Sequence, residues 1–274
     1  MLTLDTAYTG GTHVVQGTLQ LGNGGEIGSV QGDIIADGIL NVKRCNNYTL
    51  SGNISGEGQF HQTGSGTTIL EGQNSYKGAT LVASGVLQAG GVNTLSAASH
   101  HYVASDTALK TQGYDQTVAG LTNSGNVSLM GAAVGSALTV KGDYHGKSGT
   151  LELAAAQSNS GQGIADRLVI DGGKVSGSTL LKVDGSGLGA PTVGDGIEVV
   201  TAKNGATTTA QSTRDGFHLA SNRMSAGAFE YQLYAGNAKG QGENWYLRSA
   251  YRSRNHALLW SRQRGASGRP EPVR

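Results

Sequence analysis

The sequence predicts an all-β protein built as a parallel β-helix, a solenoid in which short strands stack coil upon coil. Three observations support this prediction: an internal repeat, a high glycine content with almost no proline, and a steady alternation of short apolar segments with turns. Residues 8–20 match residues 76–88, beginning with Tyr8 and Tyr76. The constant offset of about 68 residues indicates stacked units rather than one globular core.

The composition favours strands joined by tight turns. Glycine accounts for 45 of the 274 residues and proline for only 3. Glycine reaches the positive φ angles that tight turns need, whereas proline would remove backbone donors from stacked strands. Lysine and arginine number 20, and aspartate and glutamate 19, a balance that argues against a nucleic-acid-binding surface. Cys45 is the single cysteine, which excludes an intrachain disulfide and a zinc cluster.

Short apolar segments closed by Gly, Asn, Asp or Ser recur about every 8–12 residues, which is typical of strands. Helix signals are nearly absent. The predicted strands lie within residues 12–21, 32–42, 48–54, 56–60, 67–70, 80–82, 85–88, 118–121, 126–130, 137–140 and 149–153.

The repeat offset also predicts the size of a coil. Divided by three it gives about 23 residues, within the range of solenoid units. We expect Val14, Leu19 and Leu21 inside the coil, because they share their phase with Val82 and Leu87. At about 4.8 Å per coil, about twelve coils would give a rod about 55 Å long.

The sequence pattern changes from Asp166 onward. The apolar segments at residues 167–171 and 197–201 are longer, and aromatic residues become frequent. Large aromatics near the end of a solenoid indicate a cap that seals the last coil. We therefore divide the chain into a stem (residues 1–164), a cap (residues 165–250) and an arginine-rich tail (residues 251–274), which we expect to be disordered or weakly helical. The residues that we assign to the cap are Leu168, Ile170, Val199, Tyr231, Tyr234, Trp245, Tyr246 and Leu247.

Motifs that carry catalytic chemistry are weak, and we expect no enzyme activity, cofactor or metal. Residues 146–148 resemble the end of a P-loop, but Lys141 stands where that motif needs glycine. His100 and His101 are adjacent, so on a strand they face opposite sides and cannot chelate one metal together. We expect both histidines on the surface.

Asp166 and Arg167 form an adjacent acid–base pair that an active site could use. We favour a structural role, in which the stem of Arg167 packs over the solenoid and its guanidinium pairs with a neighbouring acid.

Three stretches match a known pattern. Residues 8–24 and a fuller copy at residues 49–91 share a strand–turn repeat, and residues 165–248 contain Asp-Arg-Leu-Val-Ile followed later by Asn-Trp-Tyr-Leu-Arg-Ser. With these stretches the chain resembles the passengers of bacterial autotransporters, in the pertactin-like and diffuse-adherence-adhesin-like group. The first two resemble the passenger-associated β-strand repeat, and the third resembles the C-terminal end of passengers.

The resemblance implies a right-handed parallel β-helix that a C-terminal translocator β-barrel carries to the outer membrane and cell surface by type V secretion. It implies that residues 165–250 are an autochaperone, and that the eight cap residues belong to this folding unit. We therefore expect a non-catalytic stem with a role in virulence or adhesion, whose partner is its own translocator barrel. We see neither a signal peptide at the N-terminus nor a barrel after residue 252, so we expect a fragment or a disrupted reading frame.

Two alternatives stay open. The chain is an adhesin module that contacts a host protein or glycan along its flank, with the loops at residues 157–163 and 202–215 as the first candidates for contact. Alternatively, and with less support, it is a fragment of a passenger hydrolase.

Overall fold

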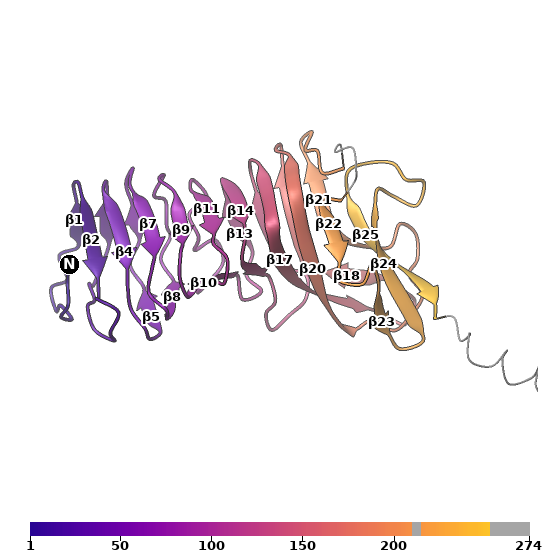
Figure 1. The fold of residues 1–274 in the computed structure, drawn as a ribbon, viewed down its shortest axis with the longest axis horizontal. Coiled ribbons are helices and arrows are strands. Elements are labelled where there is room, and N and C mark those ends of the chain that lie inside the picture. The colour runs from indigo at the N-terminus through magenta and orange to yellow at the C-terminus, as the bar shows by residue number, and fades with distance from the viewer. Residues whose placement is uncertain (210–214, 253–274) are drawn as a thin grey trace, which may run out of the picture.

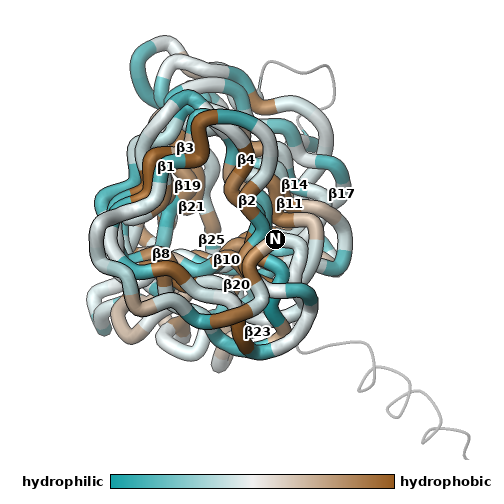
Figure 2. The backbone as a smooth tube through the Cα atoms, turned by 90° about the vertical axis from the view of Figure 1, so that its left-hand side faces the viewer, coloured by the Kyte–Doolittle hydropathy of each residue, from teal (hydrophilic) through white to brown (hydrophobic). Residues whose placement is uncertain are grey.

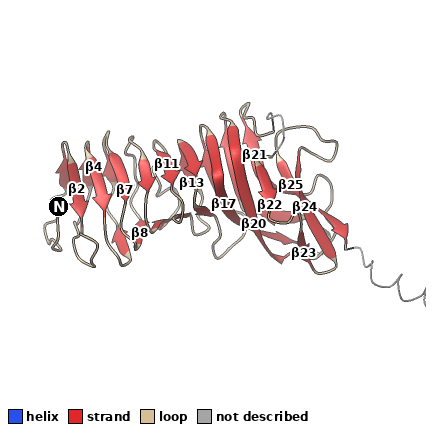
Figure 3. Cartoon of the chain, viewed as in Figure 1, coloured by secondary structure: helices blue, strands red, loops and turns tan. Residues whose placement is uncertain are grey.

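The computed structural model describes residues 1–209 and 215–252, and these form an elongated stack of strands (Figure 1). The 25 strands are joined by loops and turns alone, with no helix among the described residues (Figure 3). No described segment is therefore a helix that is long and apolar enough to cross a membrane. The predicted all-β parallel β-helix is confirmed.

Three faces run along the stack, each made of parallel strands. The first face contains two separate sheets, one with β1 (Thr12–Val14), β3 (Ile34–Ala36) and β6 (Ile54–Ser55), and one with β13 (Gln116–Val118), β16 (Ala137–Val140), β19 (Arg167–Asp171) and β21 (Ile197–Lys203). The second contains β2 (Thr18–Leu21), β4 (Ile39–Val42), β7 (Gln59–Gln62), β9 (Thr80–Val82), β11 (His100–Val103) and β14 (Gly120–Asn123). The third contains β5 (Tyr48–Leu50), β8 (Thr67–Leu70), β10 (Val86–Ala89), β12 (Ala108–Lys110), β15 (Asn126–Ser128) and β22 (Phe217–Leu219).

Two long strands join the second and third faces. In β17 (Tyr144–Gln157), Tyr144 pairs with β14 and Thr150 pairs with β15, so one strand runs around the corner. The next strand outward, β20 (Val175–Gly187), follows β17 through a bulge at the same corner. The remaining strands are β18 (Gly163–Ala165), β23 (Met224–Ala226), β24 (Phe229–Ala235) and β25 (Trp245–Tyr251).

The coils of the stem are shorter than expected. On the second face Leu40 pairs with Phe60, and Phe60 with Thr80, so one coil takes about 20 residues rather than about 23. The count of about twelve coils is not confirmed, since the second face stacks β2, β4, β7, β9, β11, β14, β17 and β20.

The internal repeat does not return to the same face. Thr12–Val14 forms β1 on the first face, whereas its counterpart Thr80–Val82 forms β9 on the second. The offset therefore spans three coils and one further face. The repeat marks a strand–glycine turn–strand unit, because each corner of the coil can use the same turn chemistry.

The three faces enclose one continuous hydrophobic core, viewed along the solenoid in Figure 2. Leu21, Val82 and Leu87 are fully buried, and Val14 is buried, as expected. Leu19 is only partly buried against this core, because its strand β2 lies at the end of the stack.

The expectation for His101 was wrong. His101 is completely buried, whereas His100 lies on the outer side of the same strand. The alternation of β11 points His101 and Val103 inward, and register aligns His101 with Thr80 and Leu121 in the core. The two histidines do face opposite sides of the strand, as expected.

Candidate functional site

In the C-terminal cap, strand pairing changes from parallel to antiparallel. β25 runs antiparallel to β21, with Ile197 opposite Leu247, and β24 runs antiparallel to β25, with Tyr234 opposite Tyr246. The parallel ladder of the first face therefore ends in an antiparallel hairpin. Such a hairpin covers the edge on which a further parallel strand would otherwise add.

Trp245 lies at one end of a row of buried aromatic rings. Its side chain is 2% exposed, and its indole N–H donates a hydrogen bond to Thr208 Oγ1 over 3.0 Å. The ring meets Phe217 edge to face at 5.3 Å between centroids, and Phe217 in turn stacks on Tyr144 at 5.9 Å. This chain of rings joins the hairpin to the last strand of the third face and to β17. Both Trp245 and Leu247 are buried.

Tyr231 fastens the hairpin to the preceding coils. The ring is fully buried, and the hydroxyl has acceptors at Gln157 Oε1 (2.7 Å) and the Ala190 carbonyl (2.8 Å). It also accepts a hydrogen bond from the Gly189 N–H over 3.1 Å. Burial raises the pKa of Tyr231, so the neutral hydroxyl that these contacts require is favoured.

The other predicted cap residues divide between core and surface. Leu168, Ile170, Val199 and Leu247 are completely buried. In contrast, Tyr246 is partly buried and Tyr234 is 41% exposed. These two tyrosines face outward because they alternate with the inward residues of their strands.

Arg248 joins the outer tyrosines. Its guanidinium carbon lies 4.9 Å from the centroid of the Tyr234 ring and 5.6 Å from that of Tyr246, within the range of a cation–π interaction. The guanidinium also donates hydrogen bonds to the carbonyl oxygens of Asp195 (2.8 Å) and Gly236 (2.6 Å). Arg248 thus holds together the loop before β21 and the loop between β24 and β25.

Sequence reasoning missed the structural role of Asp166. This residue is completely buried, and its Oδ1 accepts hydrogen bonds from the backbone N–H groups of Gly135 (2.9 Å) and Ser136 (3.0 Å), and from Ser136 Oγ. Oδ2 accepts a fourth from the Ala154 N–H over 2.9 Å. The carboxylate therefore ties the loop before β16 and strand β17 to the start of β19. Its neighbour Arg167 pairs with Glu198 at 3.8 Å, as expected.

The described residues that were candidates for phosphate binding or for contact with a host ligand lie in strands and turns. Residues 146–148 lie within β17, and no described group of three His, Cys, Asp or Glu side chains is arranged to hold a metal. Residues 157–163 form the turn between β17 and β18. Residues 210–214 of the second candidate loop lie outside the described residues, as does the tail from residue 253. Tyr251, which we assigned to the tail, instead ends β25.

Comparison with known proteins identifies two elements of the chain. Residues 117–233 match the model of the Autochaperone Domain Type 1, and residues 1–21 and 60–89 match that of the passenger-associated-transport-repeat. The autochaperone match thus begins within the stem, in β13, and ends within β24.

Several relatives share substantial sequence identity. The adhesin BmaC autotransporter of Brucella suis is 32% identical over 91% of this chain and 8% of its own length. The protein YuaQ of Escherichia coli is 32% identical over 78% of the chain and 15% of its own length, and the probable autotransporter YfaL of the same organism is 37% identical over 47% and 10%. The chain spans a small part of each relative. The two domain models and these relatives together show that the chain belongs to the pertactin-like autotransporter passengers.

Proposed function

We propose that this chain is the C-terminal part of a surface-exposed passenger, whose residues 165–250 act as an intramolecular chaperone during secretion across the outer membrane. In this proposal the cap folds first and offers its exposed ladder to the coils of the stem, which add one after another. The stem is non-catalytic and holds more distal parts of the passenger away from the cell. The partner of the chain in secretion is its own translocator barrel.

The observation that supports this proposal is a row of buried aromatic rings that connects the three faces of the solenoid. Trp245 on the hairpin and Phe217 on the third face pair within residues 165–250, and Phe217 stacks on Tyr144 of β17 in the stem. Aromatic side chains bury large areas and their edge-to-face pairs add to the stability that area alone provides. In a solenoid, stability is close to a sum of unit and neighbour terms, so a stable end unit is a seed for the weaker coils.

Separate expression of the two regions tests this proposal. Residues 165–252 and residues 1–164 are produced as two proteins and followed by circular dichroism and by limited proteolysis. We expect a cooperative, protease-resistant fold for the C-terminal protein and a largely unfolded N-terminal protein. An N-terminal protein that folds alone, beside a C-terminal protein that does not, contradicts the chaperone role.

Addition of the C-terminal protein to the unfolded N-terminal protein tests templating itself. We expect β-structure in the N-terminal protein to appear faster, whereas the same protein carrying Trp245→Ala has little effect. Equal rates with both proteins would show that the cap does not act as a template.

Adhesion is the second candidate function. BmaC is named as an adhesin, and a solenoid offers a long flank for recognition. The candidate predicts that the folded chain binds a host protein or glycan with its flank, without involvement of the cap. Binding of the purified, folded chain to host-cell surfaces, compared with that of the same chain in its unfolded state, measures it.

A further inference from the structure

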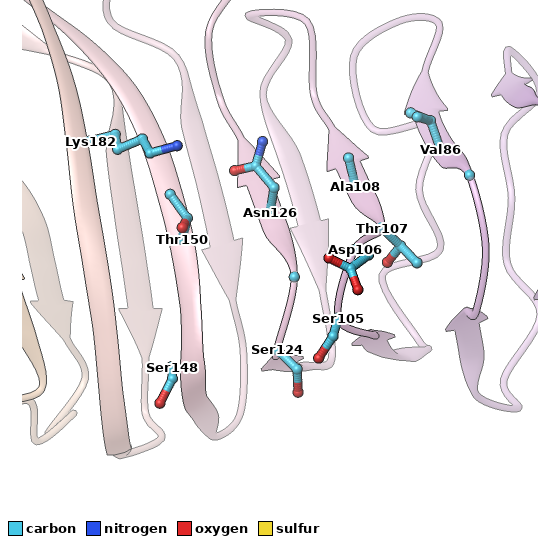
Figure 4. A pocket seen from close by; sticks show the side chains of 12 residues that line it. Val86, Ser105, Asp106, Thr107, Ala108, Ser124, Asn126, Ser148, Thr150 and Lys182 are labelled. Carbon is cyan, nitrogen blue, oxygen red and sulfur yellow. The ribbon is translucent and has the colours of Figure 1, made fainter. Parts of the chain in front are cut away.

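A polar hollow lies on the outer flank, where the second face turns into the third. It has a volume of about 550 Å³ and is lined by side chains from successive coils, among them Ser105, Asp106, Ser124, Asn126, Thr150 and Lys182. Figure 4 shows these side chains following one another along neighbouring strands. The volume is in the range of sites that take small ligands, which is about 300–1,000 Å³.

The hollow exists because one corner is shorter than its neighbours. The turn between β14 and β15 contains only Ser124 and Gly125, whereas the turn between β11 and β12 spans residues 104–107. Gly125 keeps the short turn close to the preceding coil, since a Cβ atom there would lie 2.2 Å from the Ala104 carbonyl oxygen. On the other side the corner is formed by the bulge of β17 at Lys147 and Gly149. The shape is therefore fixed by the backbone.

The polar groups of the hollow are available for a ligand. Within the described residues, the side chains of Ser105, Asp106 and Ser124 form no hydrogen bond to the rest of the chain, and Asp106 is exposed. Asn126 Oδ1 is buried and also has no partner among these residues. Rotation of its terminal amide can present either the oxygen or the N–H₂ group to the hollow. Buried polar atoms are normally paired, so the hollow has an unused acceptor.

The charges in the hollow do not favour an ionic ligand. Asp106 contributes one carboxylate, and the ammonium of Lys182 lies 3.7 Å from Glu152 Oε1, so its charge is largely compensated. The surroundings are hydroxyl groups, one amide and the small apolar surfaces of Val86 and Ala108. The described residues that line the hollow include no aromatic side chain that could anchor a peptide side chain.

We propose that this hollow binds a short segment of a neutral, hydroxyl-rich saccharide. A carboxylate accepts hydrogen bonds from two neighbouring sugar hydroxyls, while serine hydroxyls and an amide donate or accept as each ring requires. Val86 and Ala108 contact the C–H side of a ring. This inference deepens the adhesion candidate under the proposed function by naming its ligand class and its site.

Titration of the full chain by heteronuclear NMR tests the inference. The probes are maltotriose, cellotriose and triacetylchitotriose, each added to about 20 mM, a concentration that reveals dissociation constants in the millimolar range. We expect at least one probe to shift the backbone amides of residues 105–108 and 124–126. The absence of a shift with all three, or shifts confined to another region, overturns the inference.

Two pairs of variants locate the binding. Asp106→Asn removes the carboxylate, and Ser124→Leu fills the short corner; we expect each to weaken binding at least about tenfold, as for loss of a hydrogen bond to a charged group. Glu71→Gln and Ser75→Leu make the same chemical changes at exposed positions away from the hollow and should leave the affinity unchanged. Equal affinity for all four variants contradicts the assignment.

A charged probe tests the expected neutrality of the ligand. A heparin-derived tetrasaccharide that binds the same amides more tightly than the neutral probes would overturn this part of the inference. Circular dichroism and thermal unfolding of every variant verify the fold. A failure to bind saccharide leaves the separate-expression result untouched, so it is distinguishable from a failure of the chaperone proposal.

Discussion

The stem and the C-terminal region differ in the length of their strands and in the side chains that fill their cores. The stem strands up to β16 contain two to four residues, and the core between them includes polar side chains. At the junction with the C-terminal region, β17 of the stem and β20 of the C-terminal region contain 14 and 13 residues and pair along most of their length. The core of the C-terminal region ends in aromatic rings and an antiparallel hairpin.

Hydroxyl groups in the core of the stem form hydrogen bonds within a coil or to the adjacent coil. Tyr76 OH lies 2.8 Å from Thr80 Oγ1, which lies 2.8 Å from Ser99 Oγ. Ser99 Oγ donates to the Gly78 carbonyl over 2.7 Å. The two contacts of Ser99 span one coil, whereas that of Tyr76 with Thr80 lies within a coil, so a stem coil depends on its immediate neighbour already being in place. The comparison indicates a stem that folds by addition to an existing edge, whereas the cap contains the contacts that can create that edge.

The largest expected effect comes from a matched pair of aromatic truncations. Trp245→Ala should reduce the free energy of unfolding of the C-terminal region by about 3–5 kcal/mol, as for other large core truncations. Phe60→Ala removes an equally buried ring from the stem, where it stacks on Tyr76 at 6.0 Å.

We expect both variants to be destabilised in urea, but only Trp245→Ala to slow refolding strongly, because only its contacts are formed early. Stopped-flow refolding measures this difference. A loss of stability below about 1 kcal/mol for Trp245→Ala would contradict the cap assignment.

The second prediction concerns the pH dependence of the stem. Burial lowers the pKa of His101 to about 4, below the value of 6.5 of an exposed histidine. The unfolded chain therefore binds more protons between these values, so stability is fully present above pH 6.5 and falls as the pH decreases to about 4. The loss should reach about 3 kcal/mol, from 1.36 kcal/mol per pKa unit.

Urea unfolding at a series of pH values measures this loss. His101→Gln should remove most of the slope, because it keeps a polar side chain but cannot titrate. Residual slope from the partly buried His61 and His100, whose pKa values burial also lowers, stays in the variant as an internal control. An unchanged slope in His101→Gln would show that another group causes the acid sensitivity.

The third prediction tests the junction between stem and cap. Asp166→Asn replaces an acceptor of four hydrogen bonds by a group with a single acceptor oxygen. We expect a loss of about 1.5–3 kcal/mol, typical of a hydrogen bond to a charged group. Arg167→Gln, its neighbour in a partly exposed ion pair, should cost about 1 kcal/mol or less. Thermal unfolding of the two variants compares them directly, and equal losses would mean that the buried carboxylate has no special role.

The smallest effect should come from the outer face of the cap. Tyr234 is exposed and contacts the guanidinium of Arg248, so Tyr234→Ala should cost about 1 kcal/mol or less. Tyr231→Phe, which removes only the buried hydroxyl with its three partners, should cost more. Chemical denaturation of both variants ranks them, and the reverse order would place the critical contacts on the outer face.

The architecture could be predicted from the sequence because strand alternation and glycine turns are local signals. The face on which each copy of the repeat lies could not be predicted, because Thr12–Val14 and Thr80–Val82 have the same local pattern but lie on different faces. The burial of His101 could have been inferred from its alternation with Val103, but because its side chain is polar we expected it on the surface. The contacts of Asp166 and the hollow beside Ser124 depend on register between coils, which a single sequence does not state.

The aromatic cap was partly predictable for a similar reason. Trp245 and Leu247 alternate with Tyr246, so their burial on one side of a strand could be inferred from the pattern. That Phe217 would complete the row of rings depends on how the third face ends, about 28 residues earlier in the chain, and no local signal indicates it.

Native-state hydrogen exchange at increasing urea concentration tests most directly whether the C-terminal region is the folding seed. The full chain is used, and the free energy of opening is measured for each protected amide. We expect amides of β19, β21, β24 and β25 to exchange last and only by global unfolding, whereas amides of β4, β7 and β9 exchange first, as the stem opens while the cap stays folded. Stem amides that are protected as strongly as those of the cap, or more strongly, would contradict it.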